Sequence, residues 1–241
     1  MSPQLSDLGP VAQLRAGRLS RRLLQLFVGL VAYGASLALM VRGGAGLAPW
    51  DVLHSGIARL VPLTLGQVVV AMSFVVLLLW LPLRERPGLG TIANSIVVGL
   101  SADGTLALLH RPSALPLRLL LVAGGVVLCA VATAMYIGSH FGRGPRDGLM
   151  TGLVRRTGLS VRVVRTGIEL TVVLLGWLLG GTVGLGTLLF ALAIGPLVQP
   201  LLPLFSVRLD GDEREGRESR ELSDASRSAP TRPGPPSPRR S

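Results

Sequence analysis

The residues best suited to chemistry lie in two short segments with related sequences. They are, in chain order, Pro49, Trp50, Asp51 and His54 in the first segment, and Pro145, Arg146 and Asp147 in the second. Each segment follows a glycine-rich stretch, and a proline there favours the first turn of a helix. The free N–H groups at such helix ends can bind anionic groups of a solute, or the aspartate can cap its own helix. Both interpretations stay open: a paired solute site, or two structural caps.

Asp51 and His54 are three residues apart, so a helix places them on one face. Such a pair can relay protons, because histidine changes its charge near neutral pH. The alternative is a solvated histidine near a membrane surface. Trp50 has an alternative use of its own, as an anchor at the membrane interface.

A second group of candidates lies within apolar runs. Arg165 and Glu169 are four residues apart and can form an ion pair, and an intramembrane carboxylate is a candidate for function. The alternative is a purely structural pair. Secondary candidates are Asn94, Asp103 and Gln199. We expect Asp103 and Gln199 either to meet across a pseudo-twofold axis or to lie at the headgroup boundary.

These candidates belong to an internal repeat. Pro49 and Pro145 are 96 residues apart (145 − 49), and the same offset joins further pairs without a gap. The further pairs are Asp51 with Asp147, Thr64 with Ser160, Gly88-Leu89-Gly90-Thr91 with Gly184-Leu185-Gly186-Thr187, Gly99 with Gly195, and Asp103 with Gln199. A register that holds over so much of the chain indicates a duplication.

The composition places the repeat in a membrane. Hydrophobic residues make up 49% of the 241 residues, and the mean hydropathy is +0.56. The apolar runs approach membrane-spanning length. We expect an all-α polytopic membrane protein with six transmembrane helices, near 23–41, 64–83, 91–109, 117–138, 160–180 and 187–205. Short helices that cannot span the bilayer are expected near 49–60 and 145–156, and whether they re-enter the membrane or lie on it stays open.

Arginines predict the orientation, because cytoplasmic loops are enriched in basic residues. With the N-terminus inside, most loop arginines fall on one side of the membrane, so both termini are expected in the cytoplasm. Three spans per repeat then make the second repeat inverted relative to the first. The expected parts are a cytoplasmic segment at 1–20, membrane repeats at 21–110 and 116–206, and a disordered cytoplasmic tail at 210–241.

Several classes of function are not favoured. The chain shows no P-loop, no H-E-x-x-H, no G-x-S-x-G and no cluster of metal ligands, so we expect no enzyme, no metal and no cofactor. Cys129, the single cysteine, lies in an apolar run and is expected to be a buried thiol. The net charge of +11 follows from topology better than from nucleic-acid binding. The expected partners are the lipid bilayer and a small solute, and homo-oligomers are possible.

The motifs resemble those of the YczE branch of the YczE/YyaS/YitT family of bacterial integral membrane proteins. The resemblance covers about residues 22–200. It is carried by A-P-W-D-V-L-H at 48–54, G-R-G-P-R-D-G-L-M at 142–150, the two G-x-G-T motifs, Arg165 with Glu169, and the run ending at Gln199. It implies a bacterial inner-membrane protein, and it supplies no catalytic residues.

Two functions remain. The first is a small transporter or permease for a small polar or anionic solute, with its site between the repeats near Asp51, Arg146, Asp147, Arg165 and Glu169. The second is a non-transporting accessory protein that binds a partner complex or lipid. The first requires Asp51 and Asp147 to face a shared wet cavity, whereas the second lets each aspartate cap its own helix.

Overall fold

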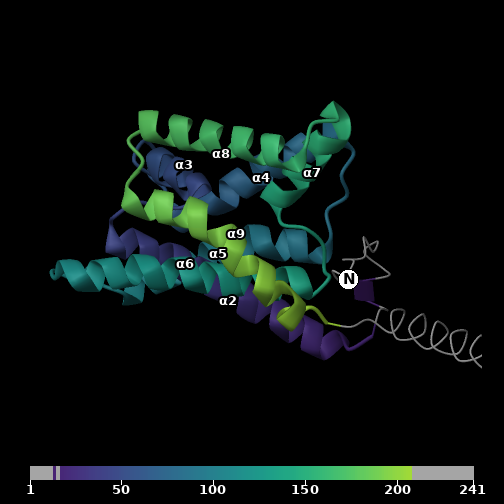
Figure 1. Ribbon diagram of the computed structural model, residues 1–241, viewed down its shortest axis with the longest axis horizontal. Coiled ribbons are helices and arrows are strands. Elements are labelled where there is room, and N and C mark those ends of the chain that lie inside the picture. The colour runs from purple at the N-terminus through teal and green to yellow at the C-terminus, as the bar shows by residue number, and fades with distance from the viewer. Residues whose placement is uncertain (1–12, 15–16, 208–241) are drawn as a thin grey trace, which may run out of the picture. The chain divides into compact units, whose positions relative to one another are not determined.

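The computed structural model describes residues 13–14 and 17–207, and this part of the chain is all-helical apart from its connections (Figure 1). The major helices are α2 (Leu19–Gly43), α3 (Pro49–Ala58), α4 (Leu65–Leu83), α5 (Leu89–Leu108), α6 (Leu115–Gly138), α7 (Pro145–Thr157), α8 (Val161–Leu178) and α9 (Leu185–Phe205). The predicted tail at 210–241 and most of the predicted segment at 1–20 lie outside the described residues.

Within the described residues, five helices are long and apolar enough to cross a membrane: α2, α4, α5, α6 and α9. The chain is therefore a polytopic membrane protein, as the sequence predicts. The remaining predicted span corresponds to α8, which has 18 residues and carries Arg162, Arg165 and Glu169. Because α8 is short and charged, the count of six spans stays a prediction.

The helix boundaries follow the local signals. Pro49 and Pro145 begin the two short helices. Thr64 and Gln67 form a capping box, in which the Thr64 hydroxyl accepts from the Gln67 N–H at 3.2 Å. Ser160 caps α8 by accepting from the Val163 N–H at 3.4 Å. Gly158, with φ of 71°, ends α7 in the left-handed region that glycine adopts without strain.

The repeat is visible in the helices themselves. Each helix of the second half begins 96 residues after its counterpart, as with Leu19 and Leu115 (115 − 19). The counterparts α2 and α6 pack along each other. Gly29 lies against Tyr136 while Gly125 lies against Met40, so the two helices run antiparallel. Glycine permits this close approach because it has no side chain.

Each short helix packs on a helix of the other repeat. The helix α3 packs on α8, and α7 packs on α4. The contacts are equivalent: a Cβ added to Gly56 would lie 2.9 Å from Leu179, and one added to Gly152 would lie 3.0 Å from Leu83. Pairing across the repeats brings both candidate segments to the middle of the helix bundle.

The two G-x-G-T motifs hold the turns that precede the short helices. The Gly90 N–H donates to the Phe141 carbonyl at 2.8 Å, and the Gly186 N–H donates to the Ala45 carbonyl at 2.7 Å. The Thr91 hydroxyl donates to the Arg143 carbonyl at 2.7 Å. These bonds join each motif to the glycine-rich turn of the other repeat, so the motif positions a helix rather than binding a nucleotide.

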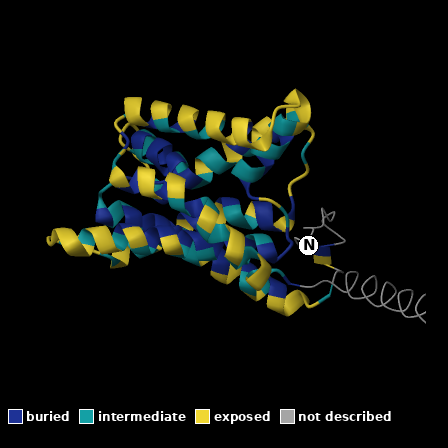
Figure 2. Ribbon diagram, viewed as in Figure 1, coloured by how far each residue is buried: buried dark blue, intermediate teal, exposed yellow. Residues whose placement is uncertain are grey.

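The buried core lies between α2 and its neighbours, while α8 and α9 expose long apolar faces (Figure 2). Several polar residues are buried with this core, and Arg22 is the largest of them. Arg22 is fully buried and donates to the carbonyls of Ser139 at 2.9 Å, His140 at 3.1 Å and Gln13 at 2.7 Å. Its guanidinium also lies 4.5 Å from the Phe141 ring centre. Arg22 thus satisfies carbonyls at the end of α6 that the helix leaves open.

Candidate functional site

Two neighbouring cavities contain most of the candidate residues. The first cavity has a volume of about 60 Å³ and lies among α2, α3, α4, α5, α6 and the start of α7. It is lined by Tyr33, Leu37, Trp50, Asp51, His54, Val69, Met72, Ser73, Val76, Asn94, Val98, Tyr136, Gly144, Pro145 and Arg146. Hydroxyl, amide, carboxylate and guanidinium groups therefore meet in a space enclosed by apolar helices.

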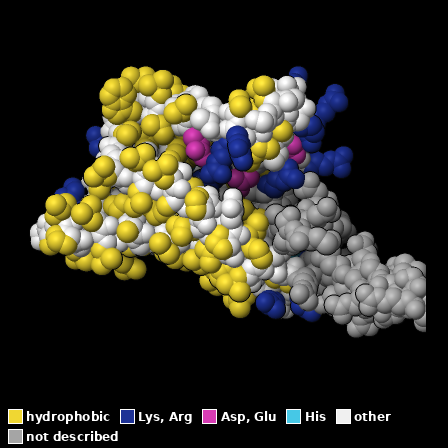
Figure 3. Space-filling view, in the orientation of Figure 1, with side chains coloured by type: hydrophobic (Ala, Val, Ile, Leu, Met, Phe, Trp, Pro, Cys, Tyr) yellow, Lys and Arg dark blue, Asp and Glu magenta, His cyan; other side chains and the backbone are white. Residues whose placement is uncertain are grey.

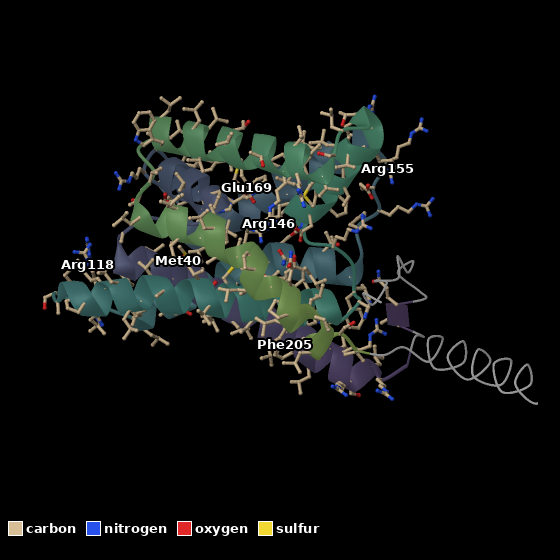
Figure 4. The ribbon with its side chains drawn as sticks, in the orientation of Figure 1. Met40, Arg118, Arg146, Arg155, Glu169 and Phe205 are labelled. Carbon is tan, nitrogen blue, oxygen red and sulfur yellow. The ribbon has the colours of Figure 1, made fainter. Side chains whose placement is uncertain are left out.

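The second cavity is larger, about 240 Å³, and lies among α3, α6, α7, α8 and α9. It is lined by Trp50, Thr133, Ile137, Arg146, Asp147, Met150, Arg165, Ile168, Glu169, Phe190, Ile194, Gly195, Val198 and Gln199. In the space-filling view, acidic and basic side chains gather at a hollow in an otherwise hydrophobic surface (Figure 3). Glu169 and Arg146 lie in the space between α8 and α9 (Figure 4).

The two cavities are related by the repeat. Nine residues of the first have a counterpart in the second at the same offset of 96 (133 − 37). The pairs are Leu37 and Thr133, Trp50 and Arg146, Asp51 and Asp147, His54 and Met150, Val69 and Arg165, Met72 and Ile168, Ser73 and Glu169, Asn94 and Phe190, and Val98 and Ile194. Trp50 and Arg146 line both cavities. The site is thus a pair of half-sites that meet at these two side chains.

The two aspartates face the cavities with different partners. Asp51 Oδ1 lies 3.2 Å from His54 Nδ1, and both side chains are buried. Asp147 Oδ2 instead accepts a hydrogen bond from the Tyr136 hydroxyl. Asp51 lines only the first cavity and Asp147 only the second, so the two carboxylates lie in neighbouring cavities rather than in one shared cavity. The choice between a paired solute site and two structural caps stays a prediction.

Arg146 is the central cation. Its Nε lies 3.8 Å from Asp147 Oδ1, and its guanidinium lies 5.4 Å from the centre of the Tyr33 ring. The guanidinium is charged at neutral pH, because the ordinary pKa of arginine lies far above it and the Asp147 carboxylate lies beside it. It can offer hydrogen bonds to a solute in either cavity.

The remaining charged candidates form the predicted pair. Arg165 Nε donates to Glu169 Oε1 at 2.9 Å, one helical turn apart on α8. Both residues line the second cavity rather than facing away from it. The two cavities together hold three acids and two arginines, counting Asp51, Arg146, Asp147, Arg165 and Glu169. Charges of both signs therefore line the two cavities.

The secondary candidates separate into two groups. Asn94 lines the first cavity and Gln199 the second. Asp103 lines neither: it accepts from the Thr64 hydroxyl, and from the Gly66 N–H at 2.8 Å. The structure thus pairs Asp103 with the N-terminus of α4 and places Gln199 at the second cavity, whereas the alternative of a place at the headgroup boundary stays a prediction. The reason for the Asp103 contact is local, since a helix N-terminus supplies free donors and favours a negative charge.

Sequence reasoning missed several residues of the site. Tyr33 and Tyr136 lie edge to face, with ring centres 6.3 Å apart, at the first cavity. They are the only two tyrosines in the chain, and both interrupt apolar runs. A polar group at these places in the sequence could have marked both residues as candidates for the site. Trp80 donates from Nε1 to the Pro145 carbonyl at 2.9 Å and so fixes the start of α7. No pattern on α4 marked Trp80, because its partner lies 65 residues away.

A metal centre receives no support from the described residues. Within 13–14 and 17–207, no three histidine, cysteine or acidic side chains lie close enough together to hold an ion. Cys129 is buried between α2 and α9, as expected for an inert thiol.

Comparison with known proteins gives one family. Residues 20–202 match a family described as a family of unknown function, DUF6198. A protein of Haemophilus influenzae described as uncharacterized is 44% identical over 181 residues, covering 75% of this chain and 83% of that one. The uncharacterized membrane protein YczE of Bacillus subtilis is 32% identical and covers 73% and 83%. The B. subtilis protein YyaS, also described as uncharacterized, is 26% identical and covers 78% and 96%. No solved structure matches.

Proposed function

We propose that this chain, a member of the membrane-protein family that contains YczE and YyaS, is a small transporter that binds a polar solute between its two repeats. The solute would occupy the second cavity and reach the first past Trp50 and Arg146. Asp51, Asp147 and Glu169 would accept hydrogen bonds from it, and Arg146 would donate. Apolar neighbours such as Ile168 and Ile194 exclude water, which strengthens these contacts.

One observation carries the proposal: two cavities related by the repeat share Trp50 and Arg146. A membrane accessory protein has no need of paired polar cavities inside its bundle. Placing carboxylates and guanidinium groups among membrane helices costs free energy, so they are expected where they serve a solute path.

We further propose six spans as two inverted repeats, with α8 crossing the membrane beside α3 and both termini in the cytoplasm of a bacterial cell. The antiparallel packing of α2 against its counterpart α6 supports inversion. The Arg165–Glu169 pair supports the span, because pairing lowers the cost of charge in a membrane. Inverted repeats with broken helices at their interface are typical of secondary transporters.

The test is a thermal-shift screen of the full chain in nanodiscs with amino acids, other zwitterions, small anions, vitamins and metal ions. A solute that binds the native state raises the melting temperature. Asp51→Asn, Asp147→Asn and Glu169→Gln are run beside the wild type. We expect a polar solute to stabilise the wild type and to lose most of its effect in these variants.

Glu85→Gln is the matched control, because Glu85 pairs with Arg155 at 3.2 Å and lines neither cavity. It should keep the solute-induced shift. If the cavity variants also keep it, the site lies elsewhere. If no solute in the screen shifts the wild type, the accessory role becomes the better explanation.

A further inference from the structure

The two repeats differ at one helix pair. The helix α4 packs closely on α5, whereas their counterparts α8 and α9 make almost no contact and leave the second cavity open between them (Figure 1). Every other major packing of the first half has its counterpart in the second: α2 on α5 matches α6 on α9, and α3 on α8 matches α7 on α4. The main asymmetry therefore lies in one pair of helices: α4 packs on α5, whereas α8 stays apart from α9. We call the first pair closed and the second pair open.

The closed pair is held by a small set of contacts. Gly66 and Gly99 bring the backbones of α4 and α5 together, since a Cβ on either would collide with the carbonyl of the other. Asp103 on α5 then accepts from the Thr64 hydroxyl, and from the Gly66 N–H at 2.8 Å, at the start of α4. These contacts cover the first cavity on that side.

The helices α8 and α9 carry a hydroxyl, a glycine and a polar side chain at the equivalent positions, but these residues are not in contact with one another. Ser160 corresponds to Thr64, Gly195 to Gly99 and Gln199 to Asp103. A Cβ added to Gly195 would meet nothing within 4 Å. Gln199 lines the second cavity. Gly104, Gly124 and Gly167 are equally open, but Gly195 differs from them because it lines the second cavity.

One further pair explains how closure would differ in the second repeat. Gly66 corresponds to Arg162, whose Cβ keeps α8 from approaching α9 as closely as α4 approaches α5. Gln199 is longer than Asp103 by one carbon–carbon bond, about 1.5 Å, and so spans the wider gap. Its amide is also neutral, and it gains less than a carboxylate from the positive end of a helix. A contact between α8 and α9 would thus be weaker than the contact between α4 and α5.

We propose that the chain has a second conformation in which the two repeats exchange roles: α8 closes on α9 and α4 parts from α5. In that conformation Gln199 accepts from Ser160 and from the Arg162 N–H, and Gly195 lies against the start of α8. The second cavity closes and the first opens, while Trp50 and Arg146 stay between them. As a transport cycle this rests on the proposed function, but the exchange itself needs no solute.

The experiment uses double electron–electron resonance to measure the distance between two spin labels, in nanodiscs and without solute. It is done at one pair of positions in each repeat. Spin labels replace Leu63 and Leu108 in one sample and their counterparts Leu159 and Leu204 in the other, in a Cys129→Ala background. All four leucines are exposed, so labels fit there. In the conformation described here, 63–108 reports the closed pair and 159–204 the open one. Exchange adds a longer component to the first distance and a shorter component to the second.

Two variants at equivalent positions shift the balance in opposite directions. Gly195→Leu fits the present conformation but blocks closure of α8 on α9, so it should remove the short 159–204 component. Gly99→Leu blocks closure of α4 on α5, so it should lengthen 63–108 and shorten 159–204. Asp103→Ala weakens the same contact without adding bulk, and it replaces Gly99→Leu if that variant does not fold.

The proposal is overturned if folded Gly99→Leu and Asp103→Ala both leave the 159–204 distance as in the wild type. It is also overturned if a short 159–204 component appears but survives the addition of Gly195→Leu, because the closure would then not use Gly195. A chain that exchanges in this way but binds no solute in the thermal-shift screen would refute the proposed function alone.

Discussion

Trp50 and Arg146 occupy the same position in the two repeats, and each lines both cavities. The repeat thus places an aromatic ring and a guanidinium where the two half-sites meet. The difference matters for chemistry, because the ring offers an apolar surface and the guanidinium offers charged hydrogen bonds. A symmetric scaffold therefore carries an asymmetric site.

The buried Arg22 is expected to be essential for stability. Arg22→Gln leaves the carbonyls of Ser139 and His140 with weaker or missing donors, and we expect a loss of about 2–4 kcal/mol. The neighbouring Arg21 is exposed, so Arg21→Gln should stay within about 0.5 kcal/mol. Thermal unfolding in detergent measures both. Equal effects of the two changes would assign the role of Arg22 to net charge rather than to its carbonyl contacts.

We expect that Gly148 cannot be replaced by a larger residue without loss of stability. Its Cβ would enter the indole ring of Trp80, which also bonds to Pro145, so Gly148→Ala should destabilise the chain by about 1–3 kcal/mol. Gly104 on α5 is the control, because an added Cβ there meets nothing within 4 Å. Gly104→Ala should be neutral or should stabilise by up to about 1 kcal/mol. Unfolding midpoints of the two variants that move together would contradict the packing of α7 on α4.

The threonines of the two G-x-G-T motifs should both stabilise the fold through their hydroxyl groups, Thr91 more than Thr187. The Thr91 hydroxyl accepts from the Gly88 N–H at 3.0 Å and donates to the Arg143 carbonyl. Thr91→Val removes both hydrogen bonds, so we expect the free energy of unfolding to fall by about 1–3 kcal/mol. Thr187 accepts from Leu47 at 3.2 Å and Gly184 at 3.3 Å, so Thr187→Val should cost less. Serine at either position keeps the hydroxyl and should restore most of the stability in chemical unfolding. Failure of serine to do so would show that the methyl group, rather than the hydroxyl, matters.

Trp177 tests whether α8 crosses the membrane. Its side chain is 60% exposed on α8, whereas Trp80 on α4 is 3% exposed. In single-tryptophan variants reconstituted with brominated lipids, we expect strong quenching of Trp177 and little quenching of Trp80. Quenching of Trp177 by aqueous acrylamide but not by brominated lipid would place α8 outside the bilayer and would remove the sixth span.

The sequence by itself determined the class of the protein and the position of each helix. Apolar runs, prolines at 49 and 145 and caps at Thr64 and Ser160 are local signals, so they predicted the helices well. The offset of 96 residues also predicted which helices correspond. It joined Asp51 with Asp147 and Gly99 with Gly195, and the two residues of each pair lie equally far from the start of their helices.

Only the tertiary structure decided what these residues touch. It paired Asp51 with His54, as helical spacing predicts, but it paired Asp147 with Tyr136, which lies on another helix. It bound Asp103 to the start of α4 and left its counterpart Gln199 at an open cavity. The physical reason is that packing between helices depends on side-chain volumes contributed by residues far apart in the sequence, and counterparts such as Gly66 and Arg162 differ strongly in that respect. Equivalent sequence positions thus received unequal surroundings.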